Sequence, residues 1–564
     1  MATVISHNIL SPLGETSVAN FEAVKSGKSS LRRLEHAFGT PLNITASVFD
    51  ETTRKQLLVE GCTWFESLVI RSIKSALQRL QIDCLDQHVC LILSTTKANV
   101  EWLGTMADEE IIPSNVARKI SSYLGFKNDP IVVCNACISG VSALITASRL
   151  IDAGVYQHVV VCGCDILGKF IVSGFDALKA LSPDECRPFD EERIGLNLGE
   201  AAATLVLSSD AFAQNSSLTE TLSWQILQGE ICNDAYHIST PSPKGIGAGL
   251  ALQRMSNKDD WAFINLHGTA TMYNDQMEWK ALEQADTKLV PVNAYKGYLG
   301  HTMGAAGILE CILSMLAVEH GVILGTRGFH ASGVSGDINI SPEVRFTNRK
   351  SFVKLISGFG GCNAAIHFSI NKKERNFQLD LPSYDVLSQV IVNQNNVNLN
   401  HHSISVNAIG KSLLTEIYKQ FIGDYPRFYK MDILSRLGFV ASELVLKSVT
   451  GFTEYDQMAV ILFNRNSSLC ADKEYQTSLC ADNYFPSPSA FVYTLPNIVA
   501  GEIALRHGIH EETSFYILPN KNEATMNKLI QLSLSRPTIS YCLVGWLECI
   551  GEEVFEAELK LIKK

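Results

Sequence analysis

Short runs of β-branched and other apolar residues alternate with helix-length amphipathic segments along most of the chain. Such runs predict buried strands at 88–95, 130–136, 158–166, 261–268 and 338–346. A helix is expected from about Ser139 to Ala153, between the second and the third of these strands. Continuous apolar strands separated by helices are typical of parallel sheets that are covered on both faces. The pattern therefore predicts an α/β fold with largely parallel strands.

The pattern changes after Lys372. The stretch 373–410 is mostly polar and contains the run NQNNVNLNHHS, which is rich in Asn and Gln. Clusters of polar residues between periodic segments indicate loops, so we interpret 373–410 as a linker or an irregular connection. Strand and helix patterns then resume over 411–564.

Residues 494–521 repeat an earlier part of the chain, 111–140. Four pairs match in order: Pro113 with Pro496, Ala117 with Ala500, Ile120 with Ile503, and Gly125 with Gly508. In this register Asn520 lies opposite Cys137, and the strand HVVVCGCD has a counterpart in ISYCLVGWLE. Because the order of elements is kept, we predict that 411–564 is a second copy of the N-terminal half-domain that lacks its cysteine.

Composition and charge narrow the class of protein. Hydrophobic residues make up 46% of the 564 residues and charged residues 19%, with a formal net charge of -11. These values are typical of a soluble globular protein with a large core. The acidic charge disfavours general nucleic-acid binding, which needs a basic surface, but it is compatible with a local basic patch for an acidic protein partner.

The 15 cysteines are scattered, and several lie inside apolar runs, among them Cys134, Cys162, Cys164 and Cys542. No pair has zinc-ligand spacing with histidines nearby, so no metal site is expected. Buried free thiols of this kind are typical of a reducing compartment. The sequence shows neither a signal-peptide pattern nor an apolar run of the ~18 residues that a membrane span needs. A cytoplasmic protein without a membrane span is therefore expected.

Cys137 is the first candidate for chemistry. It lies in VVCNACISG, between a predicted strand and a predicted helix, where Gly140 permits close approach. A helix N-terminus stabilises a thiolate through its dipole and its free N–H groups, which is expected to lower the pKa of the thiol. Taken alone, however, Cys137 is better explained as an inert buried cysteine, which is the state expected of Cys134.

Two histidines change this interpretation. His267 lies in NLHGTAT, just past an apolar strand, and His301 lies in KGYLGHTMGAAG, at the entrance to a helix. Small residues follow both, so a ligand can approach closely. Parallel α/β sheets bind ligands at the carboxyl ends of their strands. Two such histidines together with a cysteine at a helix start predict nucleophilic catalysis.

Seven blocks of sequence carry a resemblance to a known family. They are SPLG (11–14), FEAVKSGKSSL (21–31), ACISG (136–140), GFDALKALSPDECRPFDEERIGLNLGEAAA (174–203), HGTATMYNDQMEWKAL (267–282), KGYLGHTMGAAGILE (296–310) and GFGGCNAA (358–365). Over residues 3–372 the chain resembles the elongating β-ketoacyl-acyl-carrier-protein synthases. That resemblance implies a thiolase-like layered α/β/α/β/α fold with duplicated, mixed but mostly parallel sheets. It implies an N-terminal half over 1–210 with the nucleophile and a C-terminal half over 211–372 with both histidines, to which an extra α/β half-domain is added.

The resemblance also implies a reaction. Cys137 would accept an acyl group from a carrier-protein thioester. His267 and His301 would then donate hydrogen bonds to the thioester carbonyl of malonyl-carrier protein, which favours loss of CO2, and the resulting carbanion would attack the acyl-Cys137 thioester. The phosphopantetheine group arrives on the carrier protein, so no resident cofactor is expected.

Further residues match supporting positions of the family. The backbone N–H groups of Cys137 and Phe359 match the oxyanion hole, and Phe359 also matches a gating side chain beside the cysteine. Lys296 and Glu310 match a charged pair that organises the site. Thr269 and Thr271 match residues that contact the phosphopantetheine arm. From the residues alone, Lys296 and Glu310 are equally well explained as an ordinary buried ion pair.

The chain departs from the family pattern at four positions. Asn135 and Cys362 stand where the family usually has Thr, Ser357 stands for a Phe, and Ile194 replaces the Asp of an RDG motif. No departure removes a catalytic group, but Ser357 leaves the acyl chain length open. The pathway is open as well, because fatty acid, polyketide and polyene synthesis share this chemistry.

The implied partners are an acyl carrier protein and a second ketosynthase half. The family forms dimers through the N-terminal half, so a homodimer or a pseudo-dimer within one chain is expected. The C-terminal half-domain is interpreted as non-catalytic, either a scaffold, a partner in the manner of chain-length factors, or a packing appendage. Two alternatives for the whole chain are a non-catalytic chain-length-factor-like subunit and a thiolase, in which Cys362 would be the second cysteine.

Overall fold

The computed structural model describes residues 1–209, 223–370, 379–480 and 484–564. The expected boundary at 210/211 and the first residues of the expected linker, 373–378, lie outside these ranges. Within the described ranges, no helix has both the length and the apolar character that crossing a bilayer would require.

The first sheet belongs to the N-terminal part of the chain. Its strands are β1 (Ala2–Leu10), β4 (Val89–Ser94), β5 (Ile131–Val133), β6 (His158–Asp165) and β8 (Ala201–Ser209). Their order is β5–β4–β6–β8–β1, with β5, β4 and β6 parallel and with β8 and β1 antiparallel to their neighbours. All residues of β4 and β5 are buried, as expected for apolar runs covered on both faces.

The second sheet has the order β9–β15–β14–β10–β11. Its strands are β9 (Trp224–Asn233), β10 (Trp261–Asn265), β11 (Val292–Asn293), β14 (Ser351–Gly358) and β15 (Cys362–Ser369). The strand β10 is parallel to both of its neighbours, β11 and β14, and its carboxyl end leads directly to His267.

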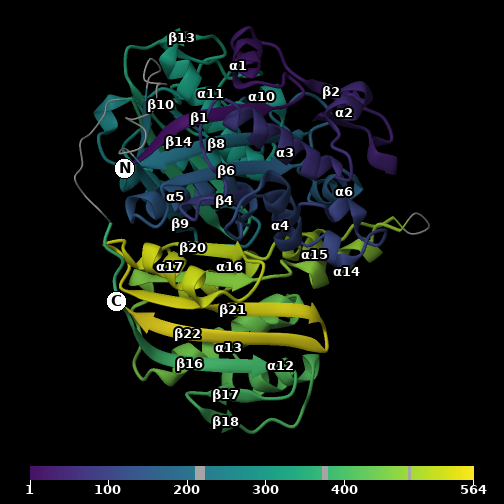
Figure 1. Cartoon of the computed structure of the whole chain (residues 1–564), viewed down its shortest axis with the longest axis vertical. Helices are drawn as coiled ribbons and strands as arrows, with labels where there is room; N and C mark the ends of the chain where they lie inside the picture. The colour runs from purple at the N-terminus through teal and green to yellow at the C-terminus, as the bar shows by residue number, and fades with distance from the viewer. Residues whose placement is uncertain (210–222, 371–378, 481–483) are drawn as a thin grey trace.

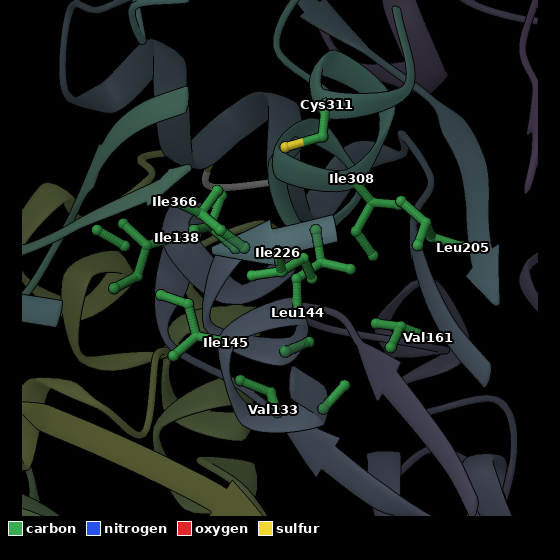
Figure 2. Packing of buried hydrophobic residues seen from close by; sticks show 14 of the residues in the cluster. Val133, Ile138, Leu144, Ile145, Val161, Leu205, Ile226, Ile308, Cys311 and Ile366 are labelled. Carbon is green, nitrogen blue, oxygen red and sulfur yellow. The ribbon is translucent and has the colours of Figure 1, made fainter. Parts of the chain in front are cut away.

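Two central helices, α5 (Ser139–Asp152) and α11 (Ala306–Glu319), pack between these sheets. Every residue of α11 except Glu319 is buried, because the helix is covered on all sides. Figure 2 shows this core, in which Leu144 and Ile145 of α5 lie with Val133 and Val161 of the first sheet and Ile366 of the second.

Outer helices complete the layers. The pair α3 (Trp64–Leu77) and α4 (Pro113–Leu124) packs on the first sheet, and α8 (Ile246–Gln253) packs on the second, with α9 (Met272–Gln284) against α8. The smaller elements of this part are α1 (Ser17–Lys25), β2 (Leu31–Leu34), β3 (Ile44–Ser47), α2 (Glu51–Leu57), α6 (Lys169–Ala177), β7 (Leu198–Gly199), α10 (Lys296–Leu299), β12 (Val322–Ile323) and β13 (Arg345–Phe346). The expected layered α/β/α/β/α fold is confirmed.

We call the described part of the chain from residue 385 onward the C-terminal unit. It contains a third sheet. Its strands are β16 (Asp385–Asn393), β17 (Val397–Leu399), β18 (His402–Ile404), β19 (Met458–Asn464), β20 (Thr513–Ile517), β21 (Tyr541–Gly551) and β22 (Val554–Lys563). Its helices are α12 (Lys411–Ile417), α13 (Ile433–Ser448), α14 (Leu469–Thr477), α15 (Pro488–Tyr493), α16 (Ile498–His507) and α17 (Glu523–Leu534).

The first and third sheets share one topology. The order β20–β19–β21–β22–β16 matches β5–β4–β6–β8–β1, and each adjacent pair has the same parallel or antiparallel sense as its counterpart. The helix between β20 and β21 is α17, as α5 lies between β5 and β6. The strands β17 and β18 extend the third sheet beyond this common core.

The two sheets join through one antiparallel pair of strands. Tyr516 of β20 lies opposite Val133 of β5, and Ile517 lies opposite Val132, so the sheets are continuous across the junction. In Figure 1 the C-terminal unit, in green to yellow, lies beside the N-terminal part with β20 at the boundary. The pairing occupies the edge of the strand that leads to Cys137.

Two sequence expectations are wrong. The stretch 373–410 is not simply a linker, because β16, β17 and β18 lie within it and β16 pairs with β22. Its polar character reflects exposure, since only Ser388, Val390 and Val392 of β16 are buried. The predicted strand 338–346 is reduced to β13, because Pro342 has no N–H to donate and the run is only partly buried. The other strands and the helix beginning at Ser139 are confirmed.

Buried ion pairs also cross the junction. Arg149 of α5 contacts Glu512 at 2.7 Å, Arg254 donates to Glu511 at 2.9 Å, and Arg536 of the C-terminal unit pairs with Glu230. Glu512 has a side chain that is only 2% exposed, so its charge depends on Arg149 for compensation.

This dependence makes a stability prediction. We expect Glu512→Ala to lower the free energy of unfolding by about 3–5 kcal/mol, because it removes the carboxylate that pairs directly with the largely buried Arg149 guanidinium. The double variant R149M/E512L removes both charges and should recover most of that loss. Urea unfolding of the three proteins checks both values, and a double variant as unstable as the single one would contradict the explanation.

Candidate active site

The sequence places Cys137 at a strained turn. It lies in a single 3-10 turn, Ala136–Ile138, between the end of β5 and the start of α5. Ala136 has φ 49°, a left-handed conformation that is costly for a residue with a side chain and that recurs at functional sites. The turn presents the thiol to a cavity of about 480 Å³.

The same cavity is lined by the other residues predicted to contact substrate. They are His267, Thr269, Thr271, His301 and Phe359. One sulfur or nitrogen atom from each of Cys137, His267 and His301 lies within 4.8 Å of those from the other two. The two imidazole rings are nearly perpendicular, at 84°, with their centroids 5.0 Å apart. The threonine hydroxyls of Thr269 and Thr271 are 2.9 Å apart.

Beneath the histidines lies a fully buried charged cluster. Lys296 Nζ donates to Glu310 Oε1 at 2.9 Å and to the His267 carbonyl oxygen at 2.6 Å. Lys354 Nζ donates to the other oxygen of Glu310 and to the Leu266 carbonyl at 3.0 Å. Burial by itself would raise the pKa of Glu310, but the charges of Lys296 and Lys354 outweigh it and hold that pKa below its ordinary value.

Burial, with the charge of this cluster added to it, keeps the two histidines neutral. Burial lowers the pKa of both His267 and His301 well below the ordinary value, and the charge of Lys296 adds to the effect. His301 Nδ1 accepts the Met303 backbone N–H at 3.3 Å. The proton of the neutral His301 ring therefore sits on Nε2, which has no protein partner among the described residues and is able to donate to a bound ligand.

The expected low pKa of the Cys137 thiol is not what the structure gives. Burial raises the pKa of Cys137 to about 12, although the charge of Lys296 acts in the lowering direction. Desolvation of the thiolate therefore outweighs the turn and helix start that follow β5. At neutral pH the nucleophile is a thiol that must give up its proton as it attacks.

Three supporting residues were missed in the sequence. One is Lys354, which pairs with the same Glu310 carboxylate as Lys296. Another is Glu278 of α9, whose carboxylate accepts the backbone N–H groups of His267 at 2.6 Å and Gly268 at 2.8 Å. Asp275 of α9 accepts the Thr269 N–H at 3.0 Å. The available signal is the pair of acids three residues apart on the helix that follows HGTAT.

The structure places the backbone segments of the two oxyanion-hole candidates, Cys137 and Phe359, next to each other. A Cβ placed on Gly358 would lie 3.1 Å from the Cys137 backbone nitrogen, so the end of β14 passes directly beside the nucleophile. Phe359 follows, and its ring stacks on Phe175 with centroids 6.3 Å apart. The repeat position Asn520 makes no comparable site, because it is exposed and its side chain donates to the exposed Asp129 at 3.4 Å.

Cysteine and histidine are also zinc ligands, so metal binding has to be weighed. The ammonium groups of Lys296 and Lys354 already disfavour positive charge on both histidines, and they would repel a divalent cation in the same way. One nitrogen of His301 is taken by Met303. The cluster therefore fits thiol chemistry better than metal binding.

The raised pKa of Cys137 predicts a pH dependence. Because the thiolate is the reactive form, alkylation of Cys137 by iodoacetamide should increase about tenfold per pH unit from pH 7 to 10. Mass spectrometry of the peptide that contains Cys137 measures this rate, with a short cysteine peptide as the reference. A rate that levels off below pH 9 would contradict the dominance of burial.

The charged cluster makes a second prediction. Glu310→Gln leaves Lys296 and Lys354 buried without a carboxylate, and we expect a loss of about 3–5 kcal/mol in the free energy of unfolding. Glu283→Gln is a matched control, because its pair with Lys280 lies at the surface and should contribute little. Urea denaturation compares the two, and equal losses would argue against this assignment.

Comparisons with known proteins show the family of the chain. Two family models match the chain, "Beta-ketoacyl synthase, N-terminal domain" over 86–213 and "Beta-ketoacyl synthase, C-terminal domain" over 225–330. The tetracenomycin polyketide synthase ketoacyl synthase alpha subunit of Streptomyces glaucescens is 31% identical over 298 residues, which cover 49% of this chain and 69% of that protein. Nodulation protein E of Rhizobium leguminosarum bv. trifolii is 30% identical over 264 residues, 46% of this chain and 65% of that protein. The chain thus spans just under two thirds of this second relative.

Solved structures extend the likeness to the whole chain at the level of fold. A structure described as "PfaC Keto synthase-Chain length factor" matches with a TM-score of 0.77 and 14% identity, over 100% of this chain and 78% of that one. The family models and the Streptomyces relative carry the stronger evidence. The ranges of the two family models include Cys137, His267 and His301. The chain belongs to the β-ketoacyl synthase family.

Proposed function

We propose that the chain is a β-ketoacyl-acyl-carrier-protein synthase, an acyltransferase that joins acyl units by decarboxylative Claisen condensation. The observation that carries this proposal is the convergence of one thiol and two neutral imidazoles, all within 4.8 Å, on one cavity. Fatty acid, polyketide and polyene-type synthesis all use this reaction, and the acyl chain length is left open.

The first half-reaction transfers an acyl group to Cys137. The sulfur attacks the thioester carbon of an acyl-carrier protein, a new C–S bond forms, and the C–S bond to the phosphopantetheine arm breaks. The thiol proton is transferred to the departing thiolate. In this proposal the N–H groups of Cys137 and Phe359 stabilise the oxyanion, and Thr269 and Thr271 contact the phosphopantetheine arm.

The second half-reaction uses malonyl-carrier protein. His301 Nε2–H and a ring N–H of His267 donate to its thioester carbonyl, which favours breaking of the bond to CO2. The electron pair forms an enolate, whose carbon attacks the acyl thioester on Cys137, and the cysteine sulfur leaves. Neutral donors suit this step, because an imidazolium ion would hold on to the carboxylate of the malonyl group.

The C-terminal unit is proposed to be a degenerate ketosynthase half-domain that takes the place of a dimer partner within one chain. Its strand order and its pairing of β20 with β5 support this proposal. The domains would then run 1–210 and 211–372 for the two ketosynthase halves, with the degenerate unit starting at β16. A small cavity behind Cys137 is lined by Phe491, Thr494 and Leu495 of this unit, which favours a role at the site over that of a mere appendage.

A thiolase is the less well supported alternative. Its second cysteine would be Cys362, but this residue is 2% exposed and its Sγ lies 3.0 Å from the Phe359 carbonyl oxygen. Burial also raises the pKa of Cys362. For a non-catalytic chain-length-factor-like subunit, the intact set of Cys137, His267 and His301 has no purpose.

Acylation of the purified chain tests the proposal. We expect incubation with acyl-carrier protein to add one acyl group to Cys137, seen by intact mass and lost in Cys137→Ala. Release of CO2 from malonyl-carrier protein should fall at least ~100-fold in His301→Ala or His267→Ala, since each removes a donor to the developing enolate. No acylation would refute the condensing enzyme, and CO2 release that survives both substitutions would refute the role of the histidines.

A further inference from the structure

The C-terminal unit reaches the active site through Asn497. This residue precedes α16 and is 4% exposed. Its Nδ2 donates to the Phe359 carbonyl oxygen at 2.8 Å and lies 3.5 Å from Cys362 Sγ. The Asn497 side chain, which belongs to the C-terminal unit, therefore fixes the backbone of Phe359, a residue that lines the same cavity as Cys137.

The loop held by Asn497 is built for close contact. Gly360 and Gly361 have φ of 89° and 70°, which only glycine adopts readily. Asn233 Nδ2 donates to the Gly360 carbonyl at 2.9 Å. On the other side a Cβ on Gly501 of α16 would lie 2.7 Å from the same oxygen, so the absence of a side chain at Gly501 lets α16 approach the loop.

The C-terminal unit also holds the strand end that precedes the nucleophile. The Phe515 backbone N–H donates to Asn135 Oδ1 at 2.7 Å, and the Cys134 N–H donates to the Phe515 carbonyl at 3.2 Å. Both segments that would supply oxyanion N–H groups are thus in contact with the C-terminal unit.

The internal repeat shows that the residues making these contacts differ between the two repeated segments. In the register that aligns Pro113 with Pro496, Asn497 corresponds to Ser114 and Gly501 to Arg118. Arg118 is exposed and lies 3.8 Å from Asp129, and an arginine would not fit where Gly501 meets Gly360. The segment that leads to the thiol thus lacks an amide and a glycine at these positions, and the segment in the C-terminal unit has both.

We propose that Asn497 is a positioning residue for the oxyanion hole at Cys137. Strand β14 fixes the backbone of Phe359 from one side, and Asn497 fixes its carbonyl from the other, so the Phe359 N–H stays aimed at the thioester oxygen. The proposal rests on the proposed function and gives the C-terminal unit a part in acyl transfer. Displacements of ~1 Å in such a group cost up to about 100-fold in rate.

Asn497→Asp is the most direct test. The carboxylate has the same size, has no N–H to donate and faces the Phe359 carbonyl oxygen. We expect acyl transfer to Cys137 to slow by about 10–100-fold. Release of CO2 from malonyl-carrier protein should stay within about twofold, because in this mechanism it depends on His267 and His301 instead of the oxyanion hole.

Two further variants keep the test decisive. Asn497→Ala removes the donor without adding charge and should show the same split between acyl transfer and CO2 release. Asn520→Ala is the matched control, since it removes an exposed asparagine of the same unit and should leave both rates unchanged. Thermal unfolding of each protein accompanies the rate measurements.

The outcomes separate the hypotheses. Equal loss of both rates together with a lower unfolding temperature would assign Asn497 a merely structural role and overturn the proposal. Unchanged acyl transfer in both Asn497 variants would overturn it as well, while the proposed function would stand. If the unmodified chain takes up no acyl group, the proposed function fails and this inference falls with it.

Discussion

The pairing of β5 with β20 is the interaction on which the site depends. Strand β5 has only three residues and leads at once to Cys137, so an unpaired edge there would leave backbone groups unsatisfied next to the nucleophile. The C-terminal unit supplies the missing strand and brings buried ion pairs to the same junction. The strained turn at Ala136 is maintained because β5, paired with β20, holds it on one side and α5 holds it on the other.

Charge burial is the second constraint. Lys296, Lys354 and Glu310 are fully buried beneath the histidines, where they fix the loop that carries His267. Burial, with the charges of the two lysines added to it, keeps both imidazoles neutral. The same low-dielectric surroundings raise the pKa of Cys137. The site thus holds a neutral thiol and two neutral donors, a combination suited to the proposed reaction, in which negative charge develops on thioester oxygens beside these groups.

The two units that share one strand order, the one with β5 and the one with β20, differ in a complementary way at the site. One retains the thiol and is completed by a second ketosynthase half that brings the histidines. The other has an exposed asparagine at the corresponding position but keeps the small and amide side chains that pack against the glycine-rich loop.

The sequence by itself determined the α/β class, the buried strands around Cys137 and the identity of the three residues at the site, because apolar runs and glycine-flanked motifs are local signals. It also indicated the repeat. It misjudged β16, whose one-sided burial resembles a polar linker, and it gave the wrong direction for the pKa of Cys137. The partnership of Lys354 with Glu310, and that of Asn497 with Phe359, were decided only by the tertiary structure. Burial sets the pKa of Cys137, and contacts between segments far apart in the chain set the two residue pairs. Neither the burial nor these contacts can be read from the neighbouring residues in the sequence.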